Sequence, residues 1–216
     1  MIKKYIAELI GTFSLVFCGT GAIIINETTN GAVTHVGIAI TFGLIVMAMI
    51  YTIGNISGSH INPAVTIAFA VAQRFPVKEV FPYIVFQLAG AFLASCILKF
   101  LFPENILLGT TLPAGSELQS FILELILTFF LMFVILNVSH GSSEQGVMAG
   151  IAIGSVVLLE AVFAGPITGA SMNPARSLAP AIISGHINHL WIYILAPVTG
   201  SVLAVVISKF INVRTI

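Results

Sequence analysis

The chain has 216 residues, of which 58% are hydrophobic and only 7% are charged, and its formal net charge is +0. Soluble domains carry about 25% charged residues, so this composition excludes a soluble globule and indicates an integral membrane protein. The few basic residues provide no electrostatic basis for binding nucleic acid.

Six apolar stretches are long enough to cross a bilayer, which needs about 20 mostly apolar residues. The first stretch carries no charged residue between Glu8 and Glu27, which is too long for the apolar core of a typical signal peptide. We therefore expect an uncleaved first span and an all-α membrane protein. The stretches cover residues 5–25, 35–54, 79–101, 118–139, 147–164 and 188–210.

Two shorter apolar segments, roughly 62–72 and 173–183, each begin with Asn-Pro-Ala. Asparagine is a preferred N-cap residue, and proline suits the first helical position because its missing N–H would be unpaired there. Each segment is therefore predicted to be a short helix that starts at membrane depth, where irregular backbone must be buried or line a water-filled cavity. The residues of the two boxes are Asn62, Pro63, Ala64, Asn173, Pro174 and Ala175.

The sequence repeats itself in its second half. Residues 7–13 read AELIGTF, and residues 123–129 read LELILTF. Each repeat holds three spans, an odd number, so the second repeat must enter the membrane upside down. Inverted repeats build transport proteins whose functional site lies near the midplane of the bilayer. We expect one channel domain of two repeats, about 1–106 and 107–216.

The positions of lysine and arginine predict the orientation, because cytoplasmic loops carry an excess of both residues. With both termini inside, the outer side has only Lys99 and Arg176. We therefore expect a multi-pass protein with both termini in the cytoplasm. The cytoplasmic positions are then Lys3, Lys4, Arg74, Lys78, Lys209 and Arg214.

The paired Asn-Pro-Ala boxes, the second followed directly by Arg176, closely resemble those of the aquaporin family, the major intrinsic proteins. The resemblance extends from Ala7-Glu8 to the last apolar segment. It implies six transmembrane helices plus two re-entrant half-helices, and a homotetramer in the cell membrane with one pore in each subunit. It also implies passive passage of water and small uncharged solutes and exclusion of protons and ions. We expect no cofactor, metal site or enzymatic activity, because the sequence offers no nucleophile–base pair, metal cluster or phosphate loop.

Asn62 and Asn173 are candidate pore residues. If the two half-helices meet end to end, each asparagine offers an amide donor to the oxygen of a passing neutral molecule. Both helix dipoles would also place their positive ends there. A cation or a proton would then meet an electrostatic barrier, whereas a dipolar solute would pass. The alternative is that both asparagines are plain N-caps.

Arg176 is a candidate for a selectivity filter, because an arginine at membrane depth is costly unless it lines water or is paired. The alternative is an arginine that snorkels to the outer headgroups. By resemblance, the other filter residues are Phe42, Ala161 and Ala170, although Phe42 could instead be a lipid-facing or core aromatic. Strict water channels carry histidine at the position of Ala161, so a wider filter that passes more than water is expected.

Two further positions separate this chain from a pure glycerol facilitator. Ser177 stands where such channels typically have aspartate, and Tyr193-Ile194 stands where they have proline and leucine. Residues 164–178 look most like the nodulin-like branch of the family, which is associated with water, glycerol and uncharged metalloid acids. Water, glycerol, urea and metalloid acids are therefore all candidate solutes.

Glu8 and Glu124 occupy equivalent positions in the two repeats, and a carboxylate at membrane depth must find donors. The resemblance implies that each supports a re-entrant loop by accepting its hydrogen bonds, which turns backbone carbonyls toward the pore. The alternative is a proton relay, which would make the protein a proton-coupled secondary transporter of a small neutral solute.

Two other titratable residues lie close to the predicted pore. His60 can line its cytoplasmic half, either as a pH-sensitive gate or as a neutral histidine bonded to the loop. Glu160 stands beside Ala161 and has no counterpart in the family pattern. It is expected either to face the outer mouth of the pore or to pair locally.

Overall fold

The computed structural model describes residues 2–139 and 143–211. In the second range, side chains are described from residue 147 onward. The predicted cytoplasmic Arg214 lies outside these residues. The described chain forms eight α-helices and contains no strand. They are α1 (Ile2–Thr28), α2 (Thr34–Ser57), α3 (Pro63–Val71), α4 (Val77–Leu101), α5 (Glu117–Val138), α6 (Ser143–Thr168), α7 (Pro174–Ser184) and α8 (Leu190–Ile211).

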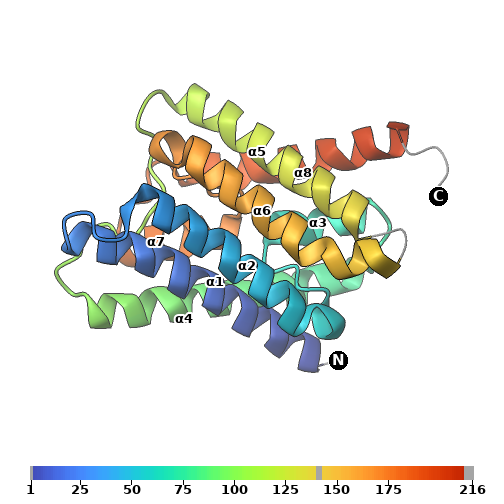
Figure 1. Ribbon diagram of the computed structural model, residues 1–216, viewed down its shortest axis with the longest axis horizontal. Helices are drawn as coiled ribbons and strands as arrows, with labels where there is room; N and C mark the ends of the chain where they lie inside the picture. Colours follow the sequence, from blue (N-terminus) through green and yellow to red (C-terminus); the bar gives the residue numbers. More distant parts are fainter. Residues whose placement is uncertain (1, 140–142, 212–216) are drawn as a thin grey trace.

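The long helices form a bundle of membrane spans. Among the described residues, six helices are long and apolar enough to cross a membrane: α1, α2, α4, α5, α6 and α8. They run along the long axis of the molecule (Figure 1), and each covers most of the stretch predicted for it. The largest differences are at α1 and α6, where the helix continues past the apolar stretch into polar residues. The predicted all-α membrane fold is confirmed.

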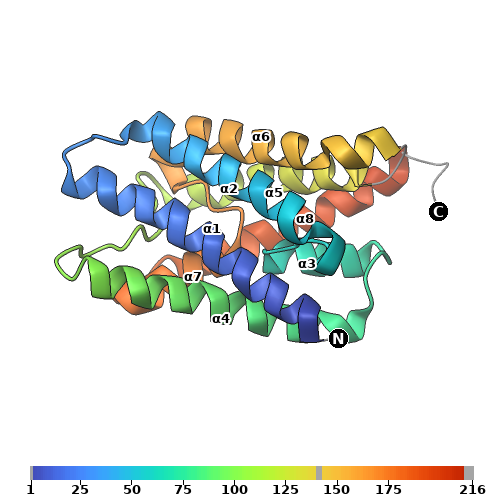
Figure 2. The same ribbon diagram turned by 60° about the horizontal axis from the view of Figure 1, so that its bottom comes forward.

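The two short helices lie inside this bundle and reach into it from opposite ends. Figure 2 shows α3 toward the end that holds the N-terminus and α7 toward the other end. With 9 and 11 residues, at a rise of about 1.5 Å per residue, neither is long enough to cross a membrane. Each begins with proline at its first helical position and is capped by the preceding asparagine, as the two boxes predicted.

The same helix packing occurs in both halves of the chain. Gly90 of α4 lies directly against the backbone carbonyl of Leu9 in α1, and Gly200 of α8 lies in the same way against the carbonyl of Leu125 in α5. Glycine allows this close approach because it has no Cβ. Small residues at helix interfaces commonly let helices pack closely within membranes. These contacts fix which residues of the two halves correspond.

Gly200→Ala is expected to destabilise the protein, because the added Cβ would overlap the carbonyl group of Leu125. Overpacking of this kind costs roughly 1–3 kcal/mol of unfolding free energy. Gly54→Ala is the matched control, since Gly54 also lies within a helix but has open space around it, and alanine there adds up to about 1 kcal/mol of helix propensity. Thermal unfolding of both variants in one detergent measures the difference. Equal melting temperatures would show that the α5–α8 contact tolerates a methyl group.

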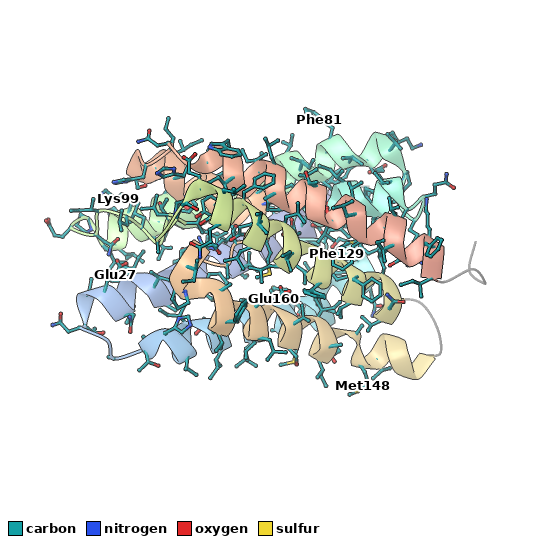
Figure 3. The ribbon with its side chains drawn as sticks, turned by 90° about the horizontal axis from the view of Figure 1, so that it is seen from above. Glu27, Phe81, Lys99, Phe129, Met148 and Glu160 are labelled. Atoms are coloured by element: carbon teal, nitrogen blue, oxygen red, sulfur yellow. The ribbon has the colours of Figure 1, made fainter. Side chains whose placement is uncertain are left out.

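Basic residues gather at the end of the bundle where α1 begins and α8 ends (Figure 1). Two of them bind backbone carbonyls near helix C-termini, where a cation is favourable. Arg74 donates to the carbonyl of Leu136 at 2.9 Å, and Lys209 donates to the carbonyl of Val71 at 3.2 Å. Lys99 lies at the opposite end (Figure 3).

Candidate pore and selectivity filter

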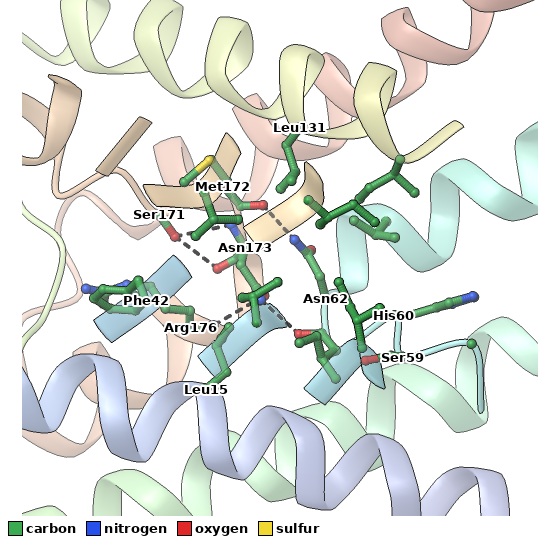
Figure 4. Close-up of a pocket in the computed structure, with 18 of the residues that line it drawn as sticks. Leu15, Phe42, Ser59, His60, Asn62, Leu131, Ser171, Met172, Asn173 and Arg176 are labelled. Carbon is green, nitrogen blue, oxygen red and sulfur yellow. Dashed lines mark hydrogen bonds between the residues drawn. The ribbon is translucent and has the colours of Figure 1, made fainter. Parts of the chain in front are cut away.

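A cavity of about 180 Å³ lies between the two halves of the chain (Figure 4). The loops that precede α3 and α7 form one side of it and contribute most of its polar groups, and Arg176 of α7 adds a charged one. Side chains of the spans form the other sides, and most of them are apolar, so a molecule inside meets polar groups mainly on the loop side. The apolar wall includes Leu15, Val46, Leu131, Ile153 and Val157.

The two asparagines meet in the wall of this cavity. Nδ2 of Asn62 donates to the carbonyl of Met172 at 2.8 Å, and Nδ2 of Asn173 donates to the carbonyl of Ile61 at 2.9 Å (Figure 4). Each Oδ1 accepts the N–H of the alanine in its own box, at 2.9 and 3.0 Å. The asparagines are therefore both N-caps and the link between the half-helices. Each amide nitrogen keeps one hydrogen for another acceptor.

Both loops adopt a left-handed backbone conformation just before the asparagines. Such a conformation costs a non-glycine residue roughly 1 kcal/mol or more, so it persists only where the surroundings impose it. The values of φ are 86° at Gly58, 48° at Ser59, 43° at Ile61, 83° at Gly169, 41° at Ala170 and 54° at Met172.

Glu8 imposes this conformation on the first loop. Its carboxylate is fully buried and accepts the backbone N–H groups of His60 at 2.9 Å and Ile61 at 2.7 Å. It also accepts the hydroxyl of Ser57 and the side-chain amide of Gln87, each at 2.7 Å. Four donors therefore surround the carboxylate, as a charged group at this depth requires.

Glu124 does the same for the second loop with three donors. It accepts the N–H groups of Ser171 and Met172 and the hydroxyl of Thr168, each at 2.8 Å. Neither Glu8 nor Glu124 is among the described residues that line the cavity. The two carboxylates are therefore placed to support the loops rather than to meet a solute.

The four predicted filter residues all line the same cavity. They are Phe42, Ala161, Ala170 and Arg176. Arg176 is only 1% exposed, donates through Nη1 to the carbonyl of Gly109 at 2.8 Å, and holds its guanidinium carbon 5.0 Å from the centre of the Phe42 ring. Arg176 therefore does not snorkel to the headgroups, and Phe42 faces the cavity rather than lipid.

His60 and Glu160 differ in their relation to the cavity. His60 lines it, stacks on the ring of Phe69 with 4.7 Å between ring centres, and places Nδ1 3.2 Å from Oγ1 of Thr66. Glu160 is 7% exposed, is not among the lining residues, and has no hydrogen-bond partner among the described residues. Among the described residues, Glu160 therefore neither lines the cavity nor has a hydrogen-bonded partner.

Several groups that support the site were missed in the sequence. Ser57 and Thr168 stand at the same distance before their asparagines, so a comparison of the two repeats could have found them. Gln87 is a polar residue in an apolar span, which is also a visible signal. The hydrogen bond from Arg176 to Gly109 is accepted by a backbone carbonyl, so no side chain in the sequence could have predicted it.

A cavity that passes between two opposed half-helices inside a bundle of six spans defines a membrane channel. The chain belongs to the major intrinsic protein family, whose pattern it matches over residues 1–208. It is therefore a passive channel for water and small solutes, not an enzyme.

Known proteins of similar sequence and structure agree with this membership. Aquaporin NIP1-1 of Oryza sativa subsp. japonica is 50% identical over 202 residues, which are 93% of this chain and 71% of that protein. Nodulin-26 of Glycine max is also 50% identical, over 93% of this chain and 74% of that protein. The aquaglyceroporin of Plasmodium falciparum has a similar structure, with a TM-score of 0.88, 27% identity, and coverage of 96% of this chain and 95% of that one.

Proposed function

We propose that this channel conducts water and uncharged solutes of about the size of glycerol, with urea and metalloid acids as further candidates, and that it excludes protons and ions. The observation that carries the proposal is the convergence of Phe42, Ala161, Ala170 and Arg176 on one cavity. A small alanine stands at position 161, so the opening between Phe42 and Arg176 is not narrowed by a third large side chain. The similarity to a protein named an aquaglyceroporin supports the same solute range.

Selection against ions follows from the charges around the cavity. Arg176 places a buried positive charge in its wall, and the N-termini of α3 and α7 add their partial positive charges near Asn62 and Asn173. A cation would have to leave water and pass both the charge of Arg176 and the positive ends of the two helices, whereas a neutral molecule only exchanges hydrogen bonds. The apolar wall opposite the loops offers no replacement for the hydration shell of an ion.

The test is a permeability panel on one preparation of liposomes that contain the purified protein. Stopped-flow light scattering measures water, glycerol and urea fluxes, and arsenous acid uptake is measured on the same vesicles. Water and glycerol permeabilities above those of empty liposomes are expected. Water permeability without any glycerol permeability would restrict the proposal to a water channel. If neither water nor glycerol permeability exceeded that of empty liposomes, the proposal would be overturned.

Ala161→His is expected to reduce glycerol permeability at least about tenfold while reducing water permeability much less, since one misplaced group in a narrow site readily costs 1–3 kcal/mol. The imidazole would add a ring and a donor to the cavity that Phe42 and Arg176 also line. Ala161→Val is the control, because it adds volume without a donor. Equal losses of water and glycerol flux in the histidine variant would mean that Ala161 does not set the width of the filter.

The sidedness and assembly of the channel are part of the same proposal. Both termini are assigned to the cytoplasm because the basic residues near α1, α3 and the end of α8 share one end of the bundle. Exposed aromatic side chains such as Phe81 (Figure 3), Phe100 and Phe210 need lipid or another copy around them, which fits a homotetramer in the cell membrane. Reporter fusions at each terminus test the orientation, and native mass spectrometry tests the tetramer.

A further inference from the structure

The ring of Phe42 lies directly on the backbone of α1 at Gly19. Gly19 is buried, and a Cβ added to it would overlap three carbons of the Phe42 ring, Cδ1, Cε1 and Cζ. Phe42 itself belongs to α2 and is only 8% exposed, so its surroundings hold the ring in this place. The missing side chain at position 19 is therefore what leaves room for the ring.

The second half of the chain has a side chain at the position that corresponds to Gly19. The matching helix contacts pair Leu9 of α1 with Leu125 of α5, so position 19 corresponds to position 135. Ile135 stands there, and its side chain lines the cavity. Gly19 is not among the described residues that line the cavity. At this level the first half therefore leaves the wall of the cavity to another helix.

That helix is α2, and its counterpart in the second half is α6. Gly43 of α2 and Gly154 of α6 each lie against the backbone carbonyl of the other, so these two positions correspond. Phe42 therefore corresponds to Ile153, which also lines the cavity. The second half builds its wall from two isoleucines, whereas the first half combines one large ring with no side chain at all.

A side chain at position 19 would change the place of the ring and with it the width of the filter. The α1 backbone is held by its packing against α2 and α4, so the ring would have to give way. The ring lines the cavity, which is the empty space into which it can move. Arg176 and Ala161 line the same cavity (Figure 4 shows Phe42 beside Arg176), so a displaced ring would narrow the passage that they share.

We propose that Gly19 is a specificity-determining residue of this channel. By leaving room for the Phe42 ring against α1, Gly19 keeps the filter wide enough for a solute of the size of glycerol. It acts through Phe42 and does not touch the solute. The inference rests on the proposed function in taking glycerol as a permeating solute.

The test compares the full-length protein with Gly19→Ala in liposomes of one composition. Glycerol permeability is expected to fall about tenfold, since one extra methylene group in a narrow site discriminates by at least that factor. Water permeability should fall much less, because water needs less width. Both fluxes are divided by the amount of protein that elutes as folded channel, so that a loss of yield is not counted as a loss of flux.

Gly21→Ala is the matched control on the same helix. A Cβ at Gly21 would meet only Leu98, at an ordinary contact distance of 3.5 Å. Both permeabilities of this variant are therefore expected to equal those of the wild type. A change in the ratio of glycerol to water permeability in Gly21→Ala as large as in Gly19→Ala would count against the inference.

A double-mutant cycle with Phe42→Leu identifies the ring as the partner of Gly19. Leucine has no atoms at the places of Cε1 and Cζ, so alanine at position 19 then fits. Glycerol permeability of the double variant is expected to stay within about twofold of Phe42→Leu alone, the usual error of additivity. The melting temperature should likewise fall in Gly19→Ala alone and not when Phe42→Leu is present. This second readout does not depend on conduction.

Each failure has a separate meaning. A wild-type protein that passes no glycerol contradicts the proposed function, and the melting temperatures still test the contact. Equal losses of water and glycerol flux in Gly19→Ala, or an unchanged ratio of the two, would overturn the inference. The same loss of glycerol flux in the presence of Phe42→Leu would also overturn it. A Gly19→Ala protein that does not fold would show that the ring cannot move into the cavity, which contradicts the inference as well.

Discussion

Arg176→Ala is expected to let cations and larger neutral solutes through the channel. The guanidinium is buried in the cavity wall, so its charge is only weakly screened by water. Two unit charges about 4 Å apart repel by about 4 kcal/mol at an effective dielectric constant of about 20, which is roughly a thousandfold in rate. Loss of the side chain also widens the opening beside Phe42. Water permeability should change much less, because water gains little from a wider path.

Val65→Ala is the matched control for this experiment. Val65 follows the first Asn-Pro-Ala box directly, as Arg176 follows the second, and it lines the same cavity without a charge. Its truncation widens the other half of the pore but leaves the electrostatic barrier in place. Cation flux through liposomes is measured with a potential-sensitive dye, and neutral solutes by stopped flow. Equal cation leaks in the two variants would show that Arg176 is not part of the selectivity filter.

Glu8→Gln is expected to damage folding of the first re-entrant loop and so to abolish the channel. Glutamine retains one acceptor oxygen, and its NH₂ group would face donors that the carboxylate now satisfies. Leaving about two buried donors unpaired costs about 2–6 kcal/mol, which is a large share of a typical stability of 5–15 kcal/mol. The left-handed residues Ser59 and Ile61 would lose the contacts that hold them.

Glu27→Gln is the control on the same helix. Glu27 is exposed and accepts one hydrogen bond from Asn105 at 2.7 Å. The substitution is therefore expected to lower the free energy of unfolding by less than about 1.5 kcal/mol. Melting temperature in detergent and water permeability in liposomes are measured for both variants. A Glu8→Gln protein of normal stability that lost only proton-driven solute flux would instead favour the proton-coupled transporter.

The spans and half-helices were predictable because their signals are local. A run of apolar residues long enough for the bilayer predicts a span wherever it occurs, and Asn62-Pro63 or Asn173-Pro174 predicts a helix start from two adjacent residues. The need of Glu8 for donors was also expected, since a carboxylate in an apolar span must find them, whereas its hydrogen bonds to the loop were implied by the family resemblance. The residues of the filter came from resemblance to a family, and the structure places all four on one cavity.

The amino-acid sequence by itself determined that this is an all-α membrane protein with six spans, and it predicted two inverted halves with a short helix starting at membrane depth in each. Only the tertiary structure decided which groups meet across those halves. The amide of Asn62 reaches the carbonyl of Met172, Arg176 reaches that of Gly109, and Glu160 reaches no described partner. Such contacts join positions far apart in the chain, often through backbone atoms. They depend on how the two halves pack, which no local pattern of side chains records.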